Sequence, residues 1–293
     1  MTWQLRTRSL EVGARTLVMA VVNLTPDSFS DGGSYPTTEA AVERCMQCLD
    51  EGADILDLGA ESTRPGSHAG SDAAVSAEQE QMRLLPVMEA VRRAAPRAVL
   101  SVDTYKAFTA RVALEAGAEI INDVSGFTWD ADVARVCAEA RCGVVLMHTR
   151  GRPDEWRAQP RFGAEQLVSM AREGLAESLF FAEKTGIARD AVVLDPGYGF
   201  GKRFDENFSL LARQDELLSL GRPLLAGLSR KSFLGHALAE FYEGQGAPVG
   251  RRENAGVAAM VTAILNGASV VRVHDVRPAV EAARIADAVL AGR

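Results

Sequence analysis

The sequence has few cysteines, no long hydrophobic run and no excess of positive charge. Only 4 cysteines, Cys45, Cys48, Cys137 and Cys142, occur among 293 residues, too few for the disulfide framework of a small secreted domain. The longest early apolar run, residues 17–22, is far shorter than the roughly 20 residues that a membrane-spanning helix needs. No export signal is visible at the start. We therefore expect a protein of the reducing cytoplasm, without a membrane partner.

The charge balance is mildly acidic. Lys and Arg number 32 and Asp and Glu number 39, so the formal net charge is −7, which argues against a nucleic-acid partner. Hydrophobic residues at 47% and charged residues at 24% are typical of an ordinary globular protein. Neither a low-complexity tract nor a linker rich in Pro, Gly and Ser marks a boundary. One domain, residues 1–293, is the simpler interpretation.

Eight short apolar runs alternate with longer stretches of helical periodicity. The runs are apolar on both faces, as strands of a covered parallel sheet are. The predicted strands are residues 16–22, 54–58, 98–102, 119–121, 143–147, 191–194, 223–227 and 269–273. The predicted helices are residues 39–51, 77–95, 105–117, 131–141, 164–184, 206–220, 254–267 and 279–291.

This alternation predicts an α/β fold, a (β/α)₈ TIM barrel. The competing arrangement, a doubly wound open sheet, usually has fewer strands and a point where the strand order reverses. Residues 3–15 precede the first strand and contain a Gly between apolar residues. They predict a short N-terminal hairpin that caps the bottom of the barrel.

Polar residues follow strand after strand at the carboxyl end. In a parallel barrel all these ends lie on one face, where such enzymes build their sites. The residues are Asn23, Asp57, Glu61, Asp103, Asn122, Asp123, His148, Asp195, Ser229, Lys231, Arg272 and His274. Polar strand ends that merely meet solvent explain one or two of these positions, but not the series.

In order and spacing, these segments resemble the dihydropteroate synthase family over nearly the whole chain. The matching motifs are Asn-Leu-Thr-Pro-Asp-Ser-Phe-Ser-Asp-Gly-Gly at 23–33, Asp-Leu-Gly-Ala-Glu-Ser-Thr-Arg-Pro-Gly at 57–66, Ser-Val-Asp-Thr at 101–104, Ile-Asn-Asp-Val-Ser-Gly at 121–126, Met-His at 147–148, Asp-Pro-Gly-Tyr-Gly-Phe-Gly-Lys at 195–202, Ser-Arg-Lys-Ser at 229–232 and Arg-Val-His-Asp at 272–275. The resemblance implies a transferase that condenses para-aminobenzoate with 6-hydroxymethyl-7,8-dihydropterin pyrophosphate. The products would be 7,8-dihydropteroate and pyrophosphate.

A pterin ring presents a guanidine-like donor edge, and buried carboxylates and amides can accept hydrogen bonds from it. Asp103, Asn122 and Asp195 meet that need. The resemblance implies that Lys231 reaches the carbonyl side of the ring and that the pocket is shaped by Met147 and Gly227. Asp103 could also stabilise the carbocation-like methylene formed as the C–O bond breaks, and Lys231 is counted with it as catalytic.

The departing diphosphate gains negative charge, so cations near it lower the barrier. Arg64, Arg272 and His274 can stabilise that charge, and the resemblance adds Thr63. Mg²⁺ prefers oxygen ligands and often bridges substrate phosphates while keeping several waters. By resemblance, its protein ligand is Asn23, although on chemistry alone an Asn after a strand is more often a turn residue.

The aminobenzoate site comes from the resemblance alone. It implies that Ser232, at the start of a helix, contacts the carboxylate and that Phe200 and Pro65 pack on the benzene ring. The loops after the first two strands are rich in Gly, Ser and Pro, as lids often are. By resemblance, Phe29 and Asp31 of the first loop and Thr63 and Arg64 of the second complete this site, and Asp31 is taken as catalytic. The family also implies a homodimer and sulfonamides as competitors of aminobenzoate.

Two other motifs are discounted, and two rival functions stay open. Cys45 and Cys48 match Cys-x-x-Cys but fall within a predicted helix, and residues 197–202 lack the first Gly and the Ser/Thr of a phosphate-binding loop. Thr149 and Arg150 follow His148 where the family usually has Met-His-Met, which puts the substrate contacts of that loop in doubt. A pterin-binding methyltransferase barrel and a catalytically inactive pterin-binding module are the alternatives.

Overall fold

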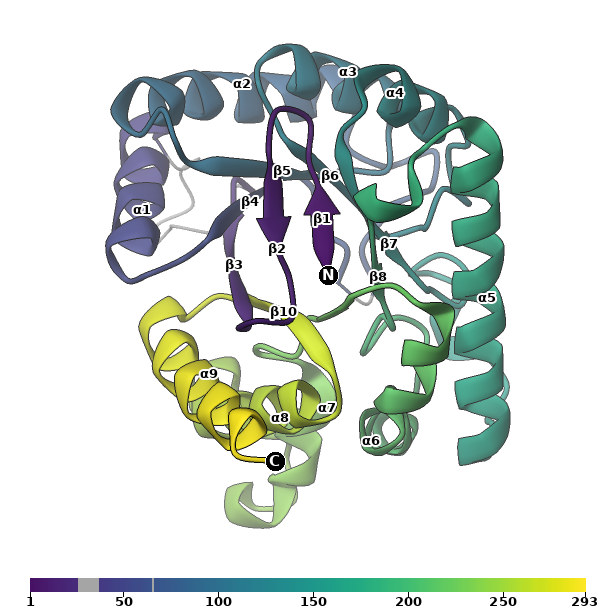
Figure 1. The fold of residues 1–293 in the computed structure, drawn as a ribbon. Helices are drawn as coiled ribbons and strands as arrows, with labels where there is room; N and C mark the ends of the chain where they lie inside the picture. The colour runs from purple at the N-terminus through teal and green to yellow at the C-terminus, as the bar shows by residue number, and fades with distance from the viewer. Residues whose placement is uncertain (26–36, 65) are drawn as a thin grey trace.

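Eight parallel strands close into a barrel in the computed structural model of the chain, which describes residues 1–25, 37–64 and 66–293 (Figure 1). The barrel strands are β3 (Leu17–Asn23), β4 (Ile55–Gly59), β5 (Val99–Asp103), β6 (Ile120–Asp123), β7 (Gly143–Met147), β8 (Val192–Asp195), β9 (Leu224–Ala226) and β10 (Ala268–Val273). Each strand pairs with the next along the chain, and β10 closes the ring against β3. The predicted barrel is confirmed, and every predicted strand falls within two residues of an observed one.

Helices form the outer layer around the strands (Figure 1). They are α1 (Thr38–Asp50), α2 (Ala77–Ala94), α3 (Ala107–Glu115), α4 (Asp132–Ala140), α5 (Ala164–Thr185), α6 (Phe204–Ala212), α7 (Ser232–Ala237), α8 (Glu253–Leu265) and α9 (Val276–Ala291). Short 3₁₀ helices are η1 (Trp156–Ala158), η2 (Arg189–Ala191), η3 (Gln214–Leu220), η4 (Ala239–Tyr242) and η5 (Val249–Arg251). Because the apolar face of each helix packs on the apolar strands, one continuous core lies between the two layers.

The single helix predicted over residues 206–220 is wrong. The chain leaves α6 at Ala212 and continues as the 3₁₀ helix η3. Gln214 is fully buried there: its amide donates to the carbonyl oxygens of Ala263 and Asn266, and it accepts a hydrogen bond from the Tyr198 hydroxyl. Tying Gln214 to three partners outside its own helix breaks the α-helical path, which periodicity cannot reveal.

The N-terminal hairpin closes one end of the barrel, as predicted (Figure 1). Its strands, β1 (Thr2–Gln4) and β2 (Ser9–Glu11), are antiparallel. Trp3 is fully buried, and its indole Nε1 donates to the Ala191 carbonyl at 2.9 Å. Leu5 lies so close to Gly143 that a Cβ there would come within 2.6 Å of a Leu5 methyl. The hairpin therefore seals the amino ends of the strands and leaves the opposite end for a site.

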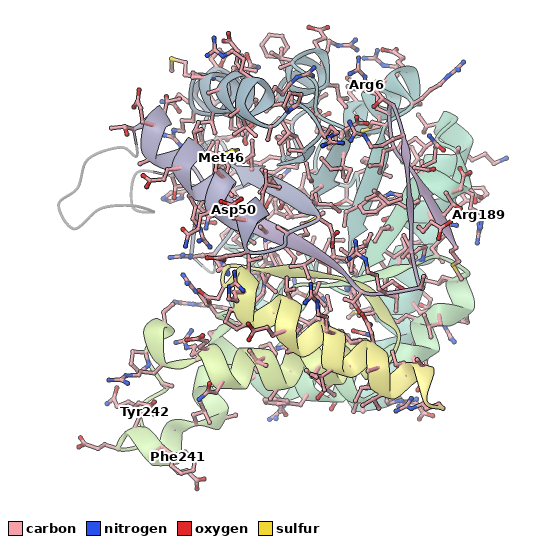
Figure 2. All side chains as sticks on the ribbon, turned by 60° about the vertical axis from the view of Figure 1, so that its left-hand side comes forward. Arg6, Met46, Asp50, Arg189, Phe241 and Tyr242 are labelled. Atoms are coloured by element: carbon pink, nitrogen blue, oxygen red, sulfur yellow. The ribbon has the colours of Figure 1, made fainter. Side chains whose placement is uncertain are left out.

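The segment between α7 and α8 stands out from the rest of the molecule. Figure 2 shows Phe241 and Tyr242 on the segment between α7 and α8 that projects from the body, well away from Arg6 in the hairpin. Among the described residues, no helix is both long and apolar enough to cross a lipid bilayer.

Candidate active site

An arginine bound to two carboxylates lies at the carboxyl end of the barrel. Arg272, on β10, donates from Nε to Asp57 Oδ2 at 2.6 Å and from Nη2 to Asp103 Oδ2 at 2.7 Å. Asp57 lies on β4 and Asp103 ends β5, so the three side chains come from across the ring. Asp103 was predicted in the sequence as a pterin ligand and Arg272 as a diphosphate ligand. The structure joins them in one network.

Asp57 lies at the centre of this network, although it was not among the residues predicted to bind substrate or to be catalytic. It is fully buried and also accepts from the Ser101 hydroxyl at 2.5 Å and from Asn122 Nδ2 at 3.1 Å. The signal was present in the sequence, because an Asp stands within the apolar run Ile55–Gly59. A carboxylate buried on a strand needs several donors to offset its lost hydration. Here Arg272, Ser101 and Asn122 provide them.

Strand register explains why the next set of side chains gathers at one level. Asn23 pairs with Gly59, Gly59 with Asp103, and Asp103 with Asn122 across four neighbouring strands. The absence of a side chain at Gly59 leaves Asn23 and Asp103 facing one another. A Cβ at Gly59 would lie 3.5 Å from Asp103 Cβ and 3.9 Å from Asn23 Oδ1.

The other side of this end holds Asp195, Gly227, Lys231 and Phe200. The Lys231 ammonium lies 4.2 Å from the centre of the Phe200 ring. Asp195 accepts from the Gly197 amide at 2.7 Å, which orders the loop after β8. A Cβ at Gly227 would lie 3.9 Å from both Asp195 Oδ2 and Arg272 Cβ, so this glycine links the two halves of the site.

Burial shifts the pKa of the central groups. It raises the pKa of Asp103 to about 7, against the lowering effect of the Arg272 guanidinium, and the nearby Asp57 raises it further. Burial also raises the pKa of Asp195 and lowers that of Lys231 to about 8. For Arg272, burial lowers the pKa, but the carboxylates of Asp57 and Asp103 outweigh it and leave the pKa above its usual value. Such perturbed groups in one place are typical of an active site.

His274 directly follows β10. Its Nδ1 forms a 3.1 Å hydrogen bond with the Ser229 hydroxyl, and the tautomer of the imidazole decides which of the two groups donates. Burial, together with the nearby Arg230 and Arg272, lowers the pKa of His274 to about 3. A neutral imidazole would offer an anion a hydrogen bond rather than a full positive charge. Ser232 is exposed at the first position of α7, directly after Lys231.

The loop after β4 is held by Glu61. This carboxylate accepts from the Val75 amide at 2.9 Å, the Tyr105 hydroxyl at 2.8 Å and the Lys106 ammonium at 2.5 Å. Arg64 is exposed and Thr63 half-buried on this loop. Within residues 1–25, 37–64 and 66–293, the structure does not bring Arg64 into the ion pairs of Asp57, Asp103 and Arg272. Three predicted site residues, Phe29, Asp31 and Pro65, lie outside the described residues.

Met147 and His148, at the end of β7, point to different environments. Met147 packs in a small apolar cluster with Tyr105, Val124 and Phe200. His148 is buried against Gly174 of α5: a Cβ on that glycine would come 2.7 Å from the imidazole. His148 therefore faces the helix layer, although its place at a strand end made it a candidate for chemistry.

No group of three or more His, Cys, Asp and Glu side chains suited to a metal ion occurs in the described part of the chain. All 4 cysteines are buried thiols, and burial raises the pKa of Cys45 to about 12. A divalent cation at this end of the barrel would thus have few protein ligands, with Asn23 Oδ1 the predicted one.

Comparison with known proteins accounts for this arrangement. Residues 19–274 match the pterin binding enzyme family. A dihydropteroate synthase from Synechocystis is 38% identical over 276 residues, which cover 94% of this chain and 91% of that protein. The chain belongs to the dihydropteroate synthase family.

Two solved dihydropteroate synthases have the same fold over their whole length. The Yersinia pestis enzyme, solved with a sulfonamide drug, superposes with a TM-score of 0.89 at 35% identity and covers 100% of both chains. The Xanthomonas albilineans enzyme, solved with 7,8-dihydropteroate, gives a TM-score of 0.82 at 37% identity and covers 99% of both. The dihydropteroate synthase family transfers a pterinylmethyl group, and this chain is such a transferase.

Proposed function

We propose that this chain condenses para-aminobenzoate with 6-hydroxymethyl-7,8-dihydropterin pyrophosphate at the carboxyl end of its one barrel domain. The observation that carries the proposal is the convergence of Asp103, Asp195, Lys231 and Arg272, from four different strand ends, around one point. A relative of the same fold binds the product 7,8-dihydropteroate, which contains both the pterin and the aminobenzoate parts of the two substrates. The methyltransferase and the inactive module have no comparable support.

The pterin half would bind to the buried polar groups. Asp103 and Asp195 accept hydrogen bonds from its amino and ring N–H groups. Asn122 donates through Nδ2 to Asp57, so its amide oxygen is the atom left to accept from the pterin. Lys231 donates to the carbonyl side, while Met147 and Gly227 shape the pocket.

The diphosphate would leave beside β10. Arg272 and His274 face it from that strand, and Thr63 and Arg64 approach from the loop after β4. Mg²⁺ fits this site as an ion held mainly by substrate and water, because Asn23 supplies one neutral amide oxygen and Mg²⁺ commonly uses few protein ligands beside phosphate. When bound, it would neutralise charge on the leaving diphosphate.

Bond cleavage precedes attack in the proposed mechanism. The C–O bond to diphosphate breaks with its electron pair leaving on oxygen, and the methylene gains carbocation character that the Asp103 carboxylate stabilises electrostatically. The aminobenzoate amine then forms the C–N bond and loses a proton. Phe200 packs on its ring and Ser232 binds its carboxylate; the family resemblance adds Pro65, Phe29 and Asp31, which lie outside the described residues.

A homodimer, a cytoplasmic location and sulfonamide binding belong to the same proposal. Phe204 and Phe208 on α6 remain substantially exposed, and a second copy of the chain would cover apolar side chains of this kind. A sulfonamide would compete with aminobenzoate, as the drug complex of the Yersinia pestis relative suggests.

The direct test is turnover. Purified protein is incubated with dihydropterin pyrophosphate, aminobenzoate and Mg²⁺, and released pyrophosphate and dihydropteroate are measured. Equal amounts of both products support the proposal. Pterin binding without either product would favour the inactive module, and methyl transfer from methyltetrahydrofolate would favour the methyltransferase.

A further inference from the structure

Arg150, in the loop after β7, forms a buried link to the loop after β8. Its side chain is almost fully buried, with 5% of the residue exposed. Nη1 donates to the Gly201 carbonyl at 3.1 Å and to Glu206 Oε2 at 3.3 Å, and Nη2 donates to the Pro160 carbonyl at 2.6 Å. The guanidinium also lies 4.6 Å from the centre of the Phe162 ring. Arg150, near the start of its loop, thus binds the end of that loop at Pro160 and the neighbouring segment at Gly201 and Glu206.

Glu206 completes the link from the other side. Oε1 accepts from the Phe162 amide at 2.8 Å, and Oε2 accepts from the Arg203 amide at 2.6 Å. Glu206 is 3% exposed. Each buried charge has its opposite and further hydrogen bonds, and these interactions offset the desolvation penalty of the pair.

Lys202 ties the same two loops together at a second point. Its ammonium donates to the carbonyl oxygens of His148, Gly197 and Phe200 at 3.2, 2.8 and 3.3 Å. Three acceptors match the three N–H bonds of an ammonium. The loop approaches so closely that a Cβ at Gly197 would lie 1.9 Å from the His148 carbonyl oxygen.

These contacts hold the backbone both before Phe200, at Gly197, and after it, at Gly201. Gly199 and Gly201 both have positive φ, 83° and 70°, so the backbone around Phe200 follows a path that depends on glycine. The Phe200 ring contacts both the Lys231 ammonium, 4.2 Å from the ring centre, and Trp156, whose ring centre is 5.2 Å away. Trp156 belongs to the Arg150 loop, and its indole donates to the Gly151 carbonyl at 3.1 Å.

We propose that Arg150 is a positioning residue for the aminobenzoate substrate. By holding the loop after β7 against the loop after β8, it fixes the Phe200 ring in contact with Trp156 and Lys231. The inference rests on the proposed function, which places Phe200 on the benzene ring of aminobenzoate.

The geometry separates the two substrates. Asp103 and Asn122, two of the proposed pterin ligands, lie on β5 and β6, and within the described ranges neither forms a hydrogen bond or ion pair with Arg150 or Glu206. Displacing Phe200 by a fraction of an ångström should therefore weaken aminobenzoate binding and leave the contacts of Asp103 and Asn122 with the pterin in place. A general loosening of the barrel would affect both substrates.

The test is the double variant Arg150→Met with Glu206→Gln, which removes both charges together and leaves neither buried alone. Steady-state kinetics are measured with each substrate varied in turn. The KM for aminobenzoate should rise about tenfold, the scale of losing hydrogen bonds to a charged group. The KM for dihydropterin pyrophosphate should stay within about twofold. Arg150→Lys, which keeps a cation, should restore part of the aminobenzoate affinity, and it provides the same test if the double variant fails to fold.

A matched control lies next to Pro160 and Glu206 in the sequence. Arg161 and Asp205 form an ion pair between the same two segments, but both side chains are largely exposed, at 66% and 60%, so Arg161→Met with Asp205→Asn should change neither KM. An unchanged KM for aminobenzoate in the Arg150 variants, or an equal rise in both KM values, would overturn the inference while the wild type still turns over. A wild type that forms no dihydropteroate would overturn the proposed function, and the inference with it.

Discussion

Replacing Asp57 by Asn should change the pH dependence of the reaction through Asp103. The two carboxylates bind different nitrogens of the same Arg272 guanidinium, at 2.6 and 2.7 Å. Asp57 is one of the groups that raise the pKa of Asp103 to about 7. Asp57→Asn removes that negative charge and keeps the size of the side chain, while one of its two accepting oxygens becomes a donating NH2 group. Arg272 and Asp103 then remain as a one-to-one pair.

The size of the effect follows from the geometry. Two carboxylates on one guanidinium lie roughly 5 Å apart, and unit charges at that distance interact by about 3 kcal/mol at an effective dielectric constant of about 20. About 1.4 kcal/mol corresponds to one pKa unit. Rearrangement of Ser101 and Asn122 around the new amide would reduce the shift. We therefore expect the pKa of Asp103 to fall by about one unit or more.

The assay is the pH profile of kcat/KM, which reports the free enzyme. Asp103 must be ionised to accept hydrogen bonds from the pterin and to stabilise the cationic methylene. In the wild type, kcat/KM should therefore rise with pH through about 7. In Asp57→Asn the same limb should move to lower pH, so that the variant retains relatively more of its activity under mildly acidic conditions.

Ser101→Ala is the matched control for this prediction. It removes the 2.5 Å hydrogen bond to Asp57 without changing any charge, so the acidic limb should stay within a few tenths of a pH unit. If the limb in Asp57→Asn stays in place or moves to higher pH, Asp103 is not the group that titrates and the electrostatic argument fails.

Three further predictions concern the site and the fold. Asp103→Asn and Lys231→Ala should each lower kcat by at least about 100-fold, the scale of lost electrostatic catalysis, with unchanged circular dichroism; wild-type turnover by either would contradict its assignment. Because burial lowers the pKa of Lys231 to about 8, kcat/KM should fall as the pH rises through about 8. Lys231→Arg should abolish this alkaline limb of the pH profile. If the limb persists in that variant, Lys231 is not the group that titrates, and Lys202, whose pKa burial lowers to about 7, is the group to examine. Trp3→Ala should lower the free energy of unfolding in urea by about 3–5 kcal/mol, as large deletions in a core do, while both KM values stay constant, since the hairpin lies at the end of the barrel opposite the site; altered KM values would show that the two ends are coupled.

Local pattern was sufficient for the strands because a strand covered on both faces must be apolar throughout. Val18–Val22 and Val144–Leu146 are buried at every position, and such short apolar runs between helical segments are typical of covered parallel strands. Periodicity was less reliable where a polar side chain has distant partners. Gln214, just after the end of α6, donates to the carbonyl oxygens of Ala263 and Asn266, about fifty residues further along the chain.

The amino-acid sequence by itself determined the barrel, the hairpin and the end at which polar residues collect, because these follow from alternation along the chain and from the rule that parallel strands share one carboxyl end. Only the tertiary structure decided which of those residues meet. Asp57 became the partner of Arg272 across 215 positions, His148 turned toward α5, and Arg150 became a buried link between two loops. Barrel closure and strand register set these contacts, and both depend on the packing of the whole ring rather than on any local segment.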